Sequence, residues 1–394
     1  MKNVLFVTSE NVSPQSGGIA RVTYLLADGL SKKGIRCISA YTQKKEDVSS
    51  LDNVFEYEKY VCGENHIKQY QDILCGNMID VVVVQGAYAA MNQELVFLRN
   101  AINSQSRNIS LYLTFHSMPG YELYFLDWSI LIRKIFTNAW REYSKQFIIQ
   151  TVMLINKSLL KKLLYKKYSI AYHTADKVIL LSSTYEDDFN LLAQEKDKSK
   201  YIAIPNMLTY PVNDDISLDK QNEVLIVARM DERSKRIKLA LQIWGMISQK
   251  LLAEGWKLTI VGEGDDLKYY KHFVESKKIC NVSFEGRQNP LSYYQRASIF
   301  MMTSSYEGWP MTLMEAMQNK CVPIVFDSYA SLHDIIISGR NGIIVENNNI
   351  NAYVSECISL MKDTKRRLKL AENALQDCKQ FSQDKIIQRW LDIL

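Results

Sequence analysis

The sequence contains no apolar run of the ~18–20 residues that a membrane-spanning helix needs. Its first residues, MKNVLFVTSE, turn polar too early for a secretory leader, whose apolar region of ~7–15 residues precedes a cleavage site. This start predicts a β-strand instead. We therefore expect a cytoplasmic protein, and peripheral contact with the inner face of the plasma membrane is considered below.

Metal-binding and disulfide patterns are also absent. The seven cysteines are scattered without a Cys-x-x-Cys pair, and the five histidines lack the spacing of metal ligands. No Asp-x-Asp motif follows a predicted strand, because the acidic stretch 213–215 lies in a predicted linker and 186–188 lies in a predicted helix. The sequence favours a reducing compartment and no metal or other cofactor.

Strong charge of either sign is missing as well. The net charge is +5 over 394 residues, and no nucleic-acid-binding module accompanies the basic residues. Nucleic acid is therefore not an expected partner. The chain has no internal repeat of 20–50 residues and no low-complexity tract, and its length suits two domains of roughly 150–200 residues.

Strand-like apolar runs alternate with helix-like segments in both halves of the chain. The runs DVVVVQG and ISLYLTF are continuous rather than alternating, as expected for parallel strands covered on both faces. This order predicts an α/β protein with two Rossmann-like, doubly wound sheets that face a central cleft. The predicted divisions are an N-terminal domain at 1–207, a linker at 208–222, a C-terminal domain at 223–383, and a last helix at 384–394 that crosses back to the first domain.

Chemically selective residues follow the predicted strands, where doubly wound sheets bind their ligands. Glycines there let the backbone approach a ligand, and a helix start after them faces an anion. A tight turn explains a Gly-Gly pair equally well. The residues at these positions are Gly17, Gly18, His116, Arg229, Lys235, Gly262, Gly264, Glu307 and Gly308.

Arg229 and Lys235 lie six positions apart across a turn in RMDERSK. Both cations can therefore converge on one diphosphate, with the arginine offering a bidentate fork. A solvated pair of cations is the alternative, because the chain has 48 lysines and arginines.

Glu307 and Glu315 lie eight positions apart in EGWPMTLMEAM, one before and one inside a helix predicted to begin near Met311. Amides around 310–313 lack partners at such a helix start and can bind a phosphate or sugar oxygen. The two carboxylates can accept hydrogen bonds from sugar hydroxyls. Alternatively, both acids merely favour the positive end of the helix dipole.

Taken together, the ordered set resembles the retaining glycosyltransferases of family 4, which have the GT-B architecture. The resemblance covers most of the chain and ends in a Glu-x7-Glu signature. Pro310 and Lys320 stand where the family commonly has glycine. The matching segments are SGGIAR, TFHS, ADKVILLS, IPN, ARMDERSK, IVGEG, FEGR and EGWPMTLMEAM.

The resemblance implies a role for each matched residue. Arg229 and Lys235 stabilise the leaving diphosphate, Glu315 holds the ribose, and Glu307 holds the donor sugar. His116 matches a family position at the sugar, although a lone histidine is otherwise a core or loop residue. Arg287 lies in the segment that borders the base. The other donor-binding positions are Gly17, Gly18, Gly262, Gly308, Trp309, Pro310, Met311, Thr312 and Leu313.

The same resemblance implies the reaction. A hexose or N-acetylhexosamine moves from a nucleotide-diphosphate sugar, UDP-linked more often than not, to a glycan or lipid-linked acceptor with retention of configuration. Such enzymes assemble bacterial surface polysaccharide or lipopolysaccharide. The alternatives are a nucleotide-sugar epimerase and a non-catalytic GT-B relative that acts as a binding module. All four signature residues of the catalytic family are present, which favours the enzyme.

The stretch 127–172 carries nine lysines and arginines against two acids. In KSLLKKLLYKKY four leucines are predicted to share one face, as in helices that lie on anionic bilayers. An ordinary domain helix with solvated lysines is the alternative. The predicted membrane or acceptor surface comprises Arg133, Lys134, Lys161, Lys162 and Lys166.

Overall fold

A computed structural model describes residues 2–10, 12–14, 18–43, 55–57, 66–86, 89–125, 151, 156–251 and 255–394. These residues form two compact units. Unit 1 comprises Met1–Met207 together with Gln383–Leu394, and unit 2 comprises Leu208–Ser382.

Unit 1 contains a seven-stranded parallel sheet in the order β3-β2-β1-β4-β5-β6-β7. The chain order reverses between β1 and β4, which makes their carboxyl ends the switch point where such sheets bind ligands. The strands are β1 (Asn3–Glu10), β2 (Arg36–Gln43), β3 (Phe55–Tyr57), β4 (Val81–Gln85), β5 (Ser110–Phe115), β6 (Lys177–Leu180) and β7 (Tyr201–Ala203).

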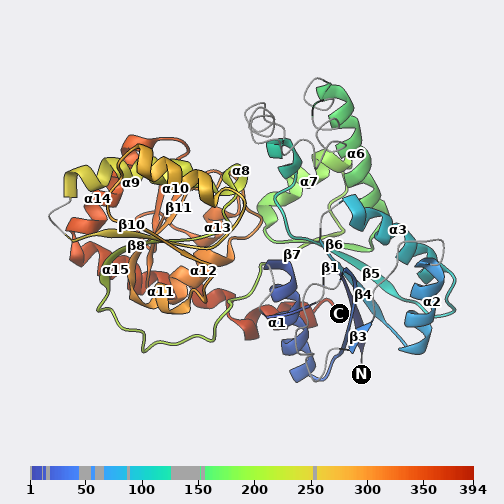
Figure 1. Cartoon of the computed structure of the whole chain (residues 1–394). Coiled ribbons are helices and arrows are strands. Elements are labelled where there is room, and N and C mark those ends of the chain that lie inside the picture. The colour runs from blue at the N-terminus through green and yellow to red at the C-terminus, as the bar shows by residue number, and fades with distance from the viewer. Residues whose placement is uncertain are drawn as a thin grey trace. The chain divides into compact units, whose positions relative to one another are not determined.

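Helices cover both faces of the first sheet (Figure 1). The four valines of β4 are 0–3% exposed, which explains why this strand is a continuous apolar run. The helical segments of unit 1 are α1 (Gly18–Lys32), α2 (His66–Gly76), α3 (Ala89–Asn103), η1 (Tyr121–Phe125), α6 (Lys157–Thr174), η2 (Ser183–Tyr185), α7 (Glu186–Ala193) and α16 (Gln383–Leu391).

The C-terminal helix α16 packs on α1 within unit 1. Ile386, Ile387 and Trp390 enter the same apolar core as Leu26 of α1. Gly29 permits this close approach, since a Cβ there would lie 2.4 Å from Cδ1 of Ile387. The last helix therefore completes a unit that the chain began almost 400 residues earlier.

Unit 2 contains a six-stranded parallel sheet in the order β10-β9-β8-β11-β12-β13, with its switch point between β8 and β11. Helices α9, α10 and α14 lie on one face, and α11, α12 and α15 lie on the other (Figure 1). The strands are β8 (Gln221–Val227), β9 (Lys257–Val261), β10 (Val282–Gly286), β11 (Ala297–Met302), β12 (Val322–Asp327) and β13 (Ile343–Glu346).

The segment 208–222, predicted to be a linker, belongs to unit 2 and packs on it. Lys379 contacts Asp214 at 2.5 Å, and Nζ of Lys320 donates to the carbonyl of Ile216 at 2.7 Å. The helices of unit 2 are α8 (Glu232–Lys235), α9 (Ile237–Leu251), α10 (Leu267–Ser276), α11 (Leu291–Arg296), α12 (Met311–Gln318), α13 (Leu332–Ile335), α14 (Ile350–Lys362), α15 (Thr364–Cys378) and η4 (Lys379–Phe381).

Candidate active site

Two predicted site residues meet at the switch point of unit 2. Lys235 ends α8, which follows β8, and Glu307 lies in the loop after β11. Nζ of Lys235 donates to Oε1 of Glu307 at 2.5 Å. The side chains are 22% and 14% exposed, so solvent reaches the pair but screens it only in part. Its position at the carboxyl edge of a parallel sheet is that of a ligand-binding group.

Hydrogen bonds tie the two loops together around this pair. Oγ1 of Thr303 donates to the carbonyl of Lys235 at 2.9 Å, and Oγ of Ser305 donates to that of Arg233 at 2.6 Å. Arg236 donates to the carbonyls of Thr303 and Ser304 at 2.5 and 2.9 Å. The backbone of Arg236 has a φ of +49°. The loops therefore form one rigid support, which no sequence motif indicated.

Arg229 follows β8 directly, and its side chain is 72% exposed. It contacts Asp231 at 3.4 Å, a long distance that leaves the guanidinium available to solvent. Burial favours a higher pKa for Asp231, but Arg233, Ser234 and Arg229 together hold that pKa below its usual value. Asp231 therefore stays ionised and caps α8 by accepting from the amide of Arg233.

Helix α12 begins at Met311, as the sequence predicted. The amides of Met311 and Thr312 stand in the first turn and have no carbonyl within the helix to donate to. They can therefore bind an anion. The amide of Leu313 differs, because it donates to the carbonyl of Pro310 at 3.1 Å. Leu313 thus has a partner in the first turn, whereas the amides of Met311 and Thr312 lack an acceptor within α12; the phosphate contacts stay predictions.

The loop before α12 is held from both sides. Oγ of Ser331 donates to the carbonyl of Gly308 at 3.0 Å. Trp309 is 5% exposed and packs edge-on against Phe381, with ring centroids 5.2 Å apart. The indole of Trp309 therefore supports the loop from inside unit 2.

Glu315 is 1% exposed and lies within α12. Its Oε1 accepts from Oγ1 of Thr209 at 2.8 Å, and its Oε2 accepts from the hydroxyl of Tyr294 at 2.9 Å. Burial and the neighbouring Glu315 carboxylate raise the pKa of Tyr294 well above its usual value, which keeps this hydroxyl a donor. Thr209 and Tyr294 are partners that sequence inspection missed.

Gly262 follows β9 and has a φ of +140°. A Cβ there would lie 1.9 Å from the carbonyl oxygen of Ala228, so only glycine allows these two loops to touch. The amide of Met230 then donates to the carbonyl of Glu263 at 2.8 Å. Arg287 is 59% exposed and lies 3.5 Å from Glu263. Close loop packing accounts for Gly262 in this structure.

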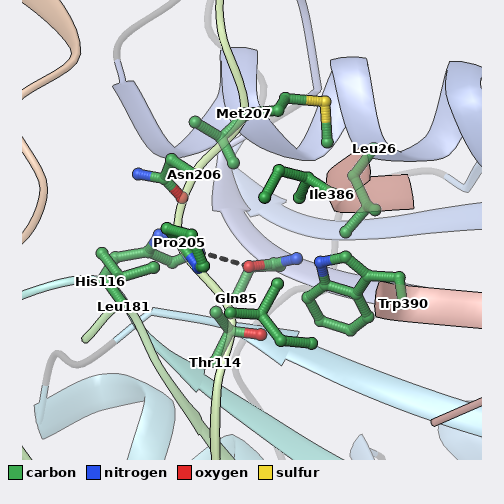
Figure 2. Close-up of a pocket in the computed structure, with 12 residues that line it drawn as sticks. Leu26, Gln85, Thr114, His116, Leu181, Pro205, Asn206, Met207, Ile386 and Trp390 are labelled. Carbon is green, nitrogen blue, oxygen red and sulfur yellow. Dashed lines mark hydrogen bonds between the residues drawn. The ribbon is translucent and has the colours of Figure 1, made fainter. Parts of the chain in front are cut away.

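His116 lies in unit 1, just after β5. Its Nε2 contacts Oε1 of Gln85, the last residue of β4 (Figure 2). Burial lowers the pKa of His116 to about 4, so the ring is neutral at pH 7. A cavity of about 10 Å³ lies beside the pair. Its lining residues are Val22, Leu26, Gln85, Thr114, His116, Leu181, Ile204, Pro205, Asn206, Met207, Ile386 and Trp390.

Several predicted positions have simpler outcomes. Gly17 lies outside the described residues, whereas Gly18 begins α1 with open space around it. Within the part of the chain that the structure describes, no group of three or more His, Cys, Asp or Glu side chains is arranged to hold a metal ion.

The predicted basic surface is described only in part. Arg133 and Lys134 lie outside the described residues, and Lys161, Lys162 and Lys166 are exposed on α6. The prediction that four leucines share one apolar face was wrong: Leu160 and Leu164 are buried, whereas Leu159 and Leu163 are 39% and 43% exposed. Leu160 and Leu164 pack together against the rest of unit 1, because residues four apart lie on the same face of a helix. No helix among the described residues is long and apolar enough to cross a membrane.

Residues 213–377 match the family model described as "Glycosyl transferases group 1". The matched range contains Arg229, Lys235, Glu307 and Glu315. The matched range lies within unit 2.

Curated relatives agree with this match. The chain is 27% identical over 231 residues to the poly(glycerol-phosphate) alpha-glucosyltransferase of Bacillus subtilis, covering 57% of this chain and 33% of that protein. It is 29% identical over 236 residues to the amylovoran biosynthesis glycosyltransferase AmsD of Erwinia amylovora, covering 57% and 63%. The chain thus spans less than two thirds of the length of these relatives. Both relatives, like the matching family model, bear the name of glycosyltransferases.

Solved structures extend the likeness to the whole chain. TarM of S. aureus superposes with a TM-score of 0.73 at 14% identity, covering 100% of this chain and 99% of that one. HepE of Anabaena superposes with a TM-score of 0.72 at 13% identity, also covering 100% and 99%. The chain therefore has the GT-B fold of two Rossmann-like units.

Proposed function

We propose that the protein is a retaining glycosyltransferase of family 4 that transfers a hexose or N-acetylhexosamine from a UDP-sugar. The contact between Lys235 and Glu307 carries this proposal. It joins a cation and a carboxylate at the switch point of unit 2, inside the range that matches the glycosyltransferase family. The spacing of Glu307 and Glu315 supports the Glu-x7-Glu assignment.

In the proposed reaction the bond between the anomeric carbon and the diphosphate oxygen breaks, and its electron pair leaves with the diphosphate. Arg229 and Lys235 neutralise the charge that grows there, together with the amides of Met311 and Thr312. In this proposal the two side-chain cations and the amides neutralise the diphosphate without a metal ion. Glu307 accepts hydrogen bonds from the donor sugar, where positive charge develops.

The acceptor hydroxyl then forms a bond to the anomeric carbon on the face that the diphosphate leaves. Its proton passes to the departing phosphate oxygen, so the configuration is retained. Glu315 holds the ribose, Arg287 borders the base, and His116 acts at the donor sugar. Each of these roles comes from the family resemblance and remains a proposal for this chain.

The acceptor is proposed to be a glycan or a lipid-linked glycan of the bacterial surface. The relatives' names support this class: one acts on poly(glycerol-phosphate), and one in amylovoran biosynthesis. A third relative, from Campylobacter jejuni, extends an undecaprenol-linked glycan. It is 27% identical over 196 residues, covering 50% of this chain and 54% of that protein.

We further propose contact with an anionic membrane, and the exposed side of α6 supports it. We call Leu159, Lys161, Lys162, Leu163 and Lys166 the α6 patch. Both leucines are more than a third exposed; Lys162 and Lys166 lie three or four positions from them on the same side of the helix, and Lys161 is exposed two positions away from each. Apolar and basic side chains on one helix surface suit the boundary of a bilayer with negative headgroups.

A binding and turnover experiment tests the proposed function. Thermal unfolding is measured with EDTA and UDP, GDP, ADP or CMP, on the wild type and Arg229→Ala. UDP at ~100 times its dissociation constant stabilises the protein by about 2.7 kcal/mol, and Arg229→Ala loses most of this effect. Lys271→Ala, an exposed lysine on α10, is the matched control.

UDP release is then followed with a panel of UDP-sugars and surface-glycan acceptors. Transfer with retained configuration supports the proposal. Conversion of the donor into its epimer without UDP release overturns it in favour of an epimerase. Nucleotide binding with neither reaction favours a binding module.

A further inference from the structure

Gln85 ends β4 beside the switch point of unit 1, and its neighbour across the sheet is Thr114 of β5. Two residues further along that chain lies His116. Gln85 is 1% exposed, and Thr114 is 2% exposed. A carboxamide, a hydroxyl and an imidazole therefore meet at the edge of the sheet where ligands bind.

The contact between Gln85 and His116 determines where the imidazole carries its hydrogen. With the carboxamide oxygen of Gln85 placed toward the ring, Nε2 of His116 is the donor, because that oxygen can only accept a hydrogen bond. The ring is neutral at pH 7 because burial disfavours its charged form. A neutral ring with its hydrogen on Nε2 keeps a lone pair on Nδ1.

Apart from His116, the described neighbours of the Gln85 carboxamide do not explain why a polar side chain is placed here. Leu26, Ile386 and Trp390 lie around the carboxamide (Figure 2). Nε2 of Gln85 and Oγ1 of Thr114 are buried without a hydrogen-bond partner. A leucine would pack here without that cost. The contact with His116 is the interaction that accounts for the carboxamide.

The cavity beside Gln85 and His116 limits the size of any molecule that could contact Nε2 of Gln85 or Oγ1 of Thr114. Its volume of about 10 Å³ is close to that of one water-sized probe. Apart from His116, no residue that lines it is titratable. Among the described residues that line the cavity, the polar neighbours of the imidazole are Gln85, Thr114 and Asn206, and none of them is a carboxylate.

We infer that Gln85 is a positioning residue that holds His116 in the tautomer with hydrogen on Nε2, so that Nδ1 accepts a hydrogen bond from the donor sugar. The inference rests on the proposed function for the part played by the sugar. The tautomer itself is a property of the free protein.

The tautomer is measured by long-range proton–nitrogen NMR on protein labelled at the histidine nitrogens. Five histidines give few signals, and His116→Asn identifies the one of interest. We expect hydrogen on Nε2 at pH 7 in the wild type. In Gln85→Leu both tautomers become populated, and in Gln85→Glu the new carboxylate raises the pKa of His116 and keeps both nitrogens protonated. A wild-type signal with hydrogen on Nδ1 overturns the inference.

Thr114→Val is the matched control. Thr114 lines the same cavity, and the substitution removes a buried oxygen. It leaves the Gln85–His116 contact in place, so His116 should keep its wild-type tautomer. Gln85→Met, which is closer in shape to glutamine than leucine is, replaces Gln85→Leu if the latter does not fold.

Kinetics separate the inference from the proposed function. Loss of one well-placed hydrogen bond in Gln85→Leu lowers kcat about 10-fold with KM for the acceptor unchanged. If the tautomer changes but kcat does not, the positioning role is wrong while the proposed function stands. If no nucleotide binds the wild type, the proposed function fails while the tautomer assignment is still tested.

Discussion

Nζ of Lys235 donates to Oε1 of Glu307 at 2.5 Å, across 72 residues of sequence. The contact joins the loops that follow β8 and β11. We expect Lys235→Ala and Glu307→Ala each to lower the transfer rate by about 10²–10³-fold, because each removes charge placed for the transition state. The double variant should lose less than the sum of the two, since the residues act as one unit. Initial rates of UDP release measure this.

Lys271→Ala serves as the control for that series and should transfer sugar at the wild-type rate. Lys235→Ala and Glu307→Ala should each also lower the free energy of unfolding by about 1–3 kcal/mol, because each leaves the partner's charge unpaired where the side chains are only 22% and 14% exposed. Wild-type rates in both single variants would contradict the catalytic assignment.

Glu315 should affect both stability and nucleotide binding. Glu315→Ala removes the acceptor of Thr209 and Tyr294, which costs about 2 kcal/mol in the free energy of unfolding. It should also weaken UDP binding. Tyr294→Phe is the matched variant, since it removes one internal hydrogen bond but no carboxylate, and UDP affinity should stay near that of the wild type. Urea unfolding and calorimetric titration measure the two effects. Unchanged UDP affinity in Glu315→Ala would refute the ribose role.

Gly262→Ala should destabilise unit 2 by roughly 3 kcal/mol or more, because its Cβ collides with the backbone of Ala228. Gly255→Ala is the control, since Gly255 also has a positive φ, +68°, but no atom within 4 Å of a built Cβ. Its cost should be about 1–2 kcal/mol from backbone strain alone. Urea unfolding of both variants separates the clash from the strain. Equal costs would mean that the loops relax apart easily.

His116 should make stability depend on pH. Its folded pKa of about 4 lies below the usual 6.5, so the unfolded chain binds the proton first as the pH falls. The stability that the neutral ring contributes is present above pH 6.5 and is lost as the pH falls to about 4. We expect the wild type to lose about 2 kcal/mol more than His116→Asn between pH 7 and pH 4.5. Urea unfolding at both pH values measures the difference, and parallel losses would contradict the assigned shift.

The α6 patch should bind anionic vesicles. Reversing Lys161, Lys162 and Lys166 to glutamate should lower partitioning onto phosphatidylglycerol vesicles by at least ~100-fold, because each lysine contributes about 1 kcal/mol. Leu159→Ser with Leu163→Ser should weaken binding further. Reversal of Lys362, Lys365 and Lys369, exposed in unit 2, is the charge-matched control. Vesicle sedimentation measures both, and equal losses would point to net charge rather than the patch.

Much of the fold could be predicted from the sequence because its strands are buried on both faces. Val81–Val84 form a continuous apolar run, and this pattern has few other interpretations. The start of α12 at Met311 was predicted for a similar reason, since Pro310 ends the loop before a helical apolar pattern. Strand β3 was missed because its three residues are too short for a pattern.

The candidate site could be predicted only in part. Residue types at the ends of strands are visible in a sequence, which is why Arg229, Lys235 and Glu307 could be proposed as site residues, and the structure brings Lys235 and Glu307 together. Gln85 gave only a weak signal, a polar residue that ends the apolar run of β4. Whether Leu159 or Leu160 faces the core could not be read from two pairs of leucines four positions apart, because it depends on how α6 docks.

What the sequence determined by itself is the order of strands and helices and the chemical groups at the strand ends. Those features depend on neighbours a few residues away. Tertiary structure alone decided which distant groups touch: Glu315 with Thr209 across 106 residues, Lys235 with Glu307 across 72, and His116 with Gln85 across 31. Such contacts arise when elements pack, and packing depends on the whole chain rather than on any local pattern.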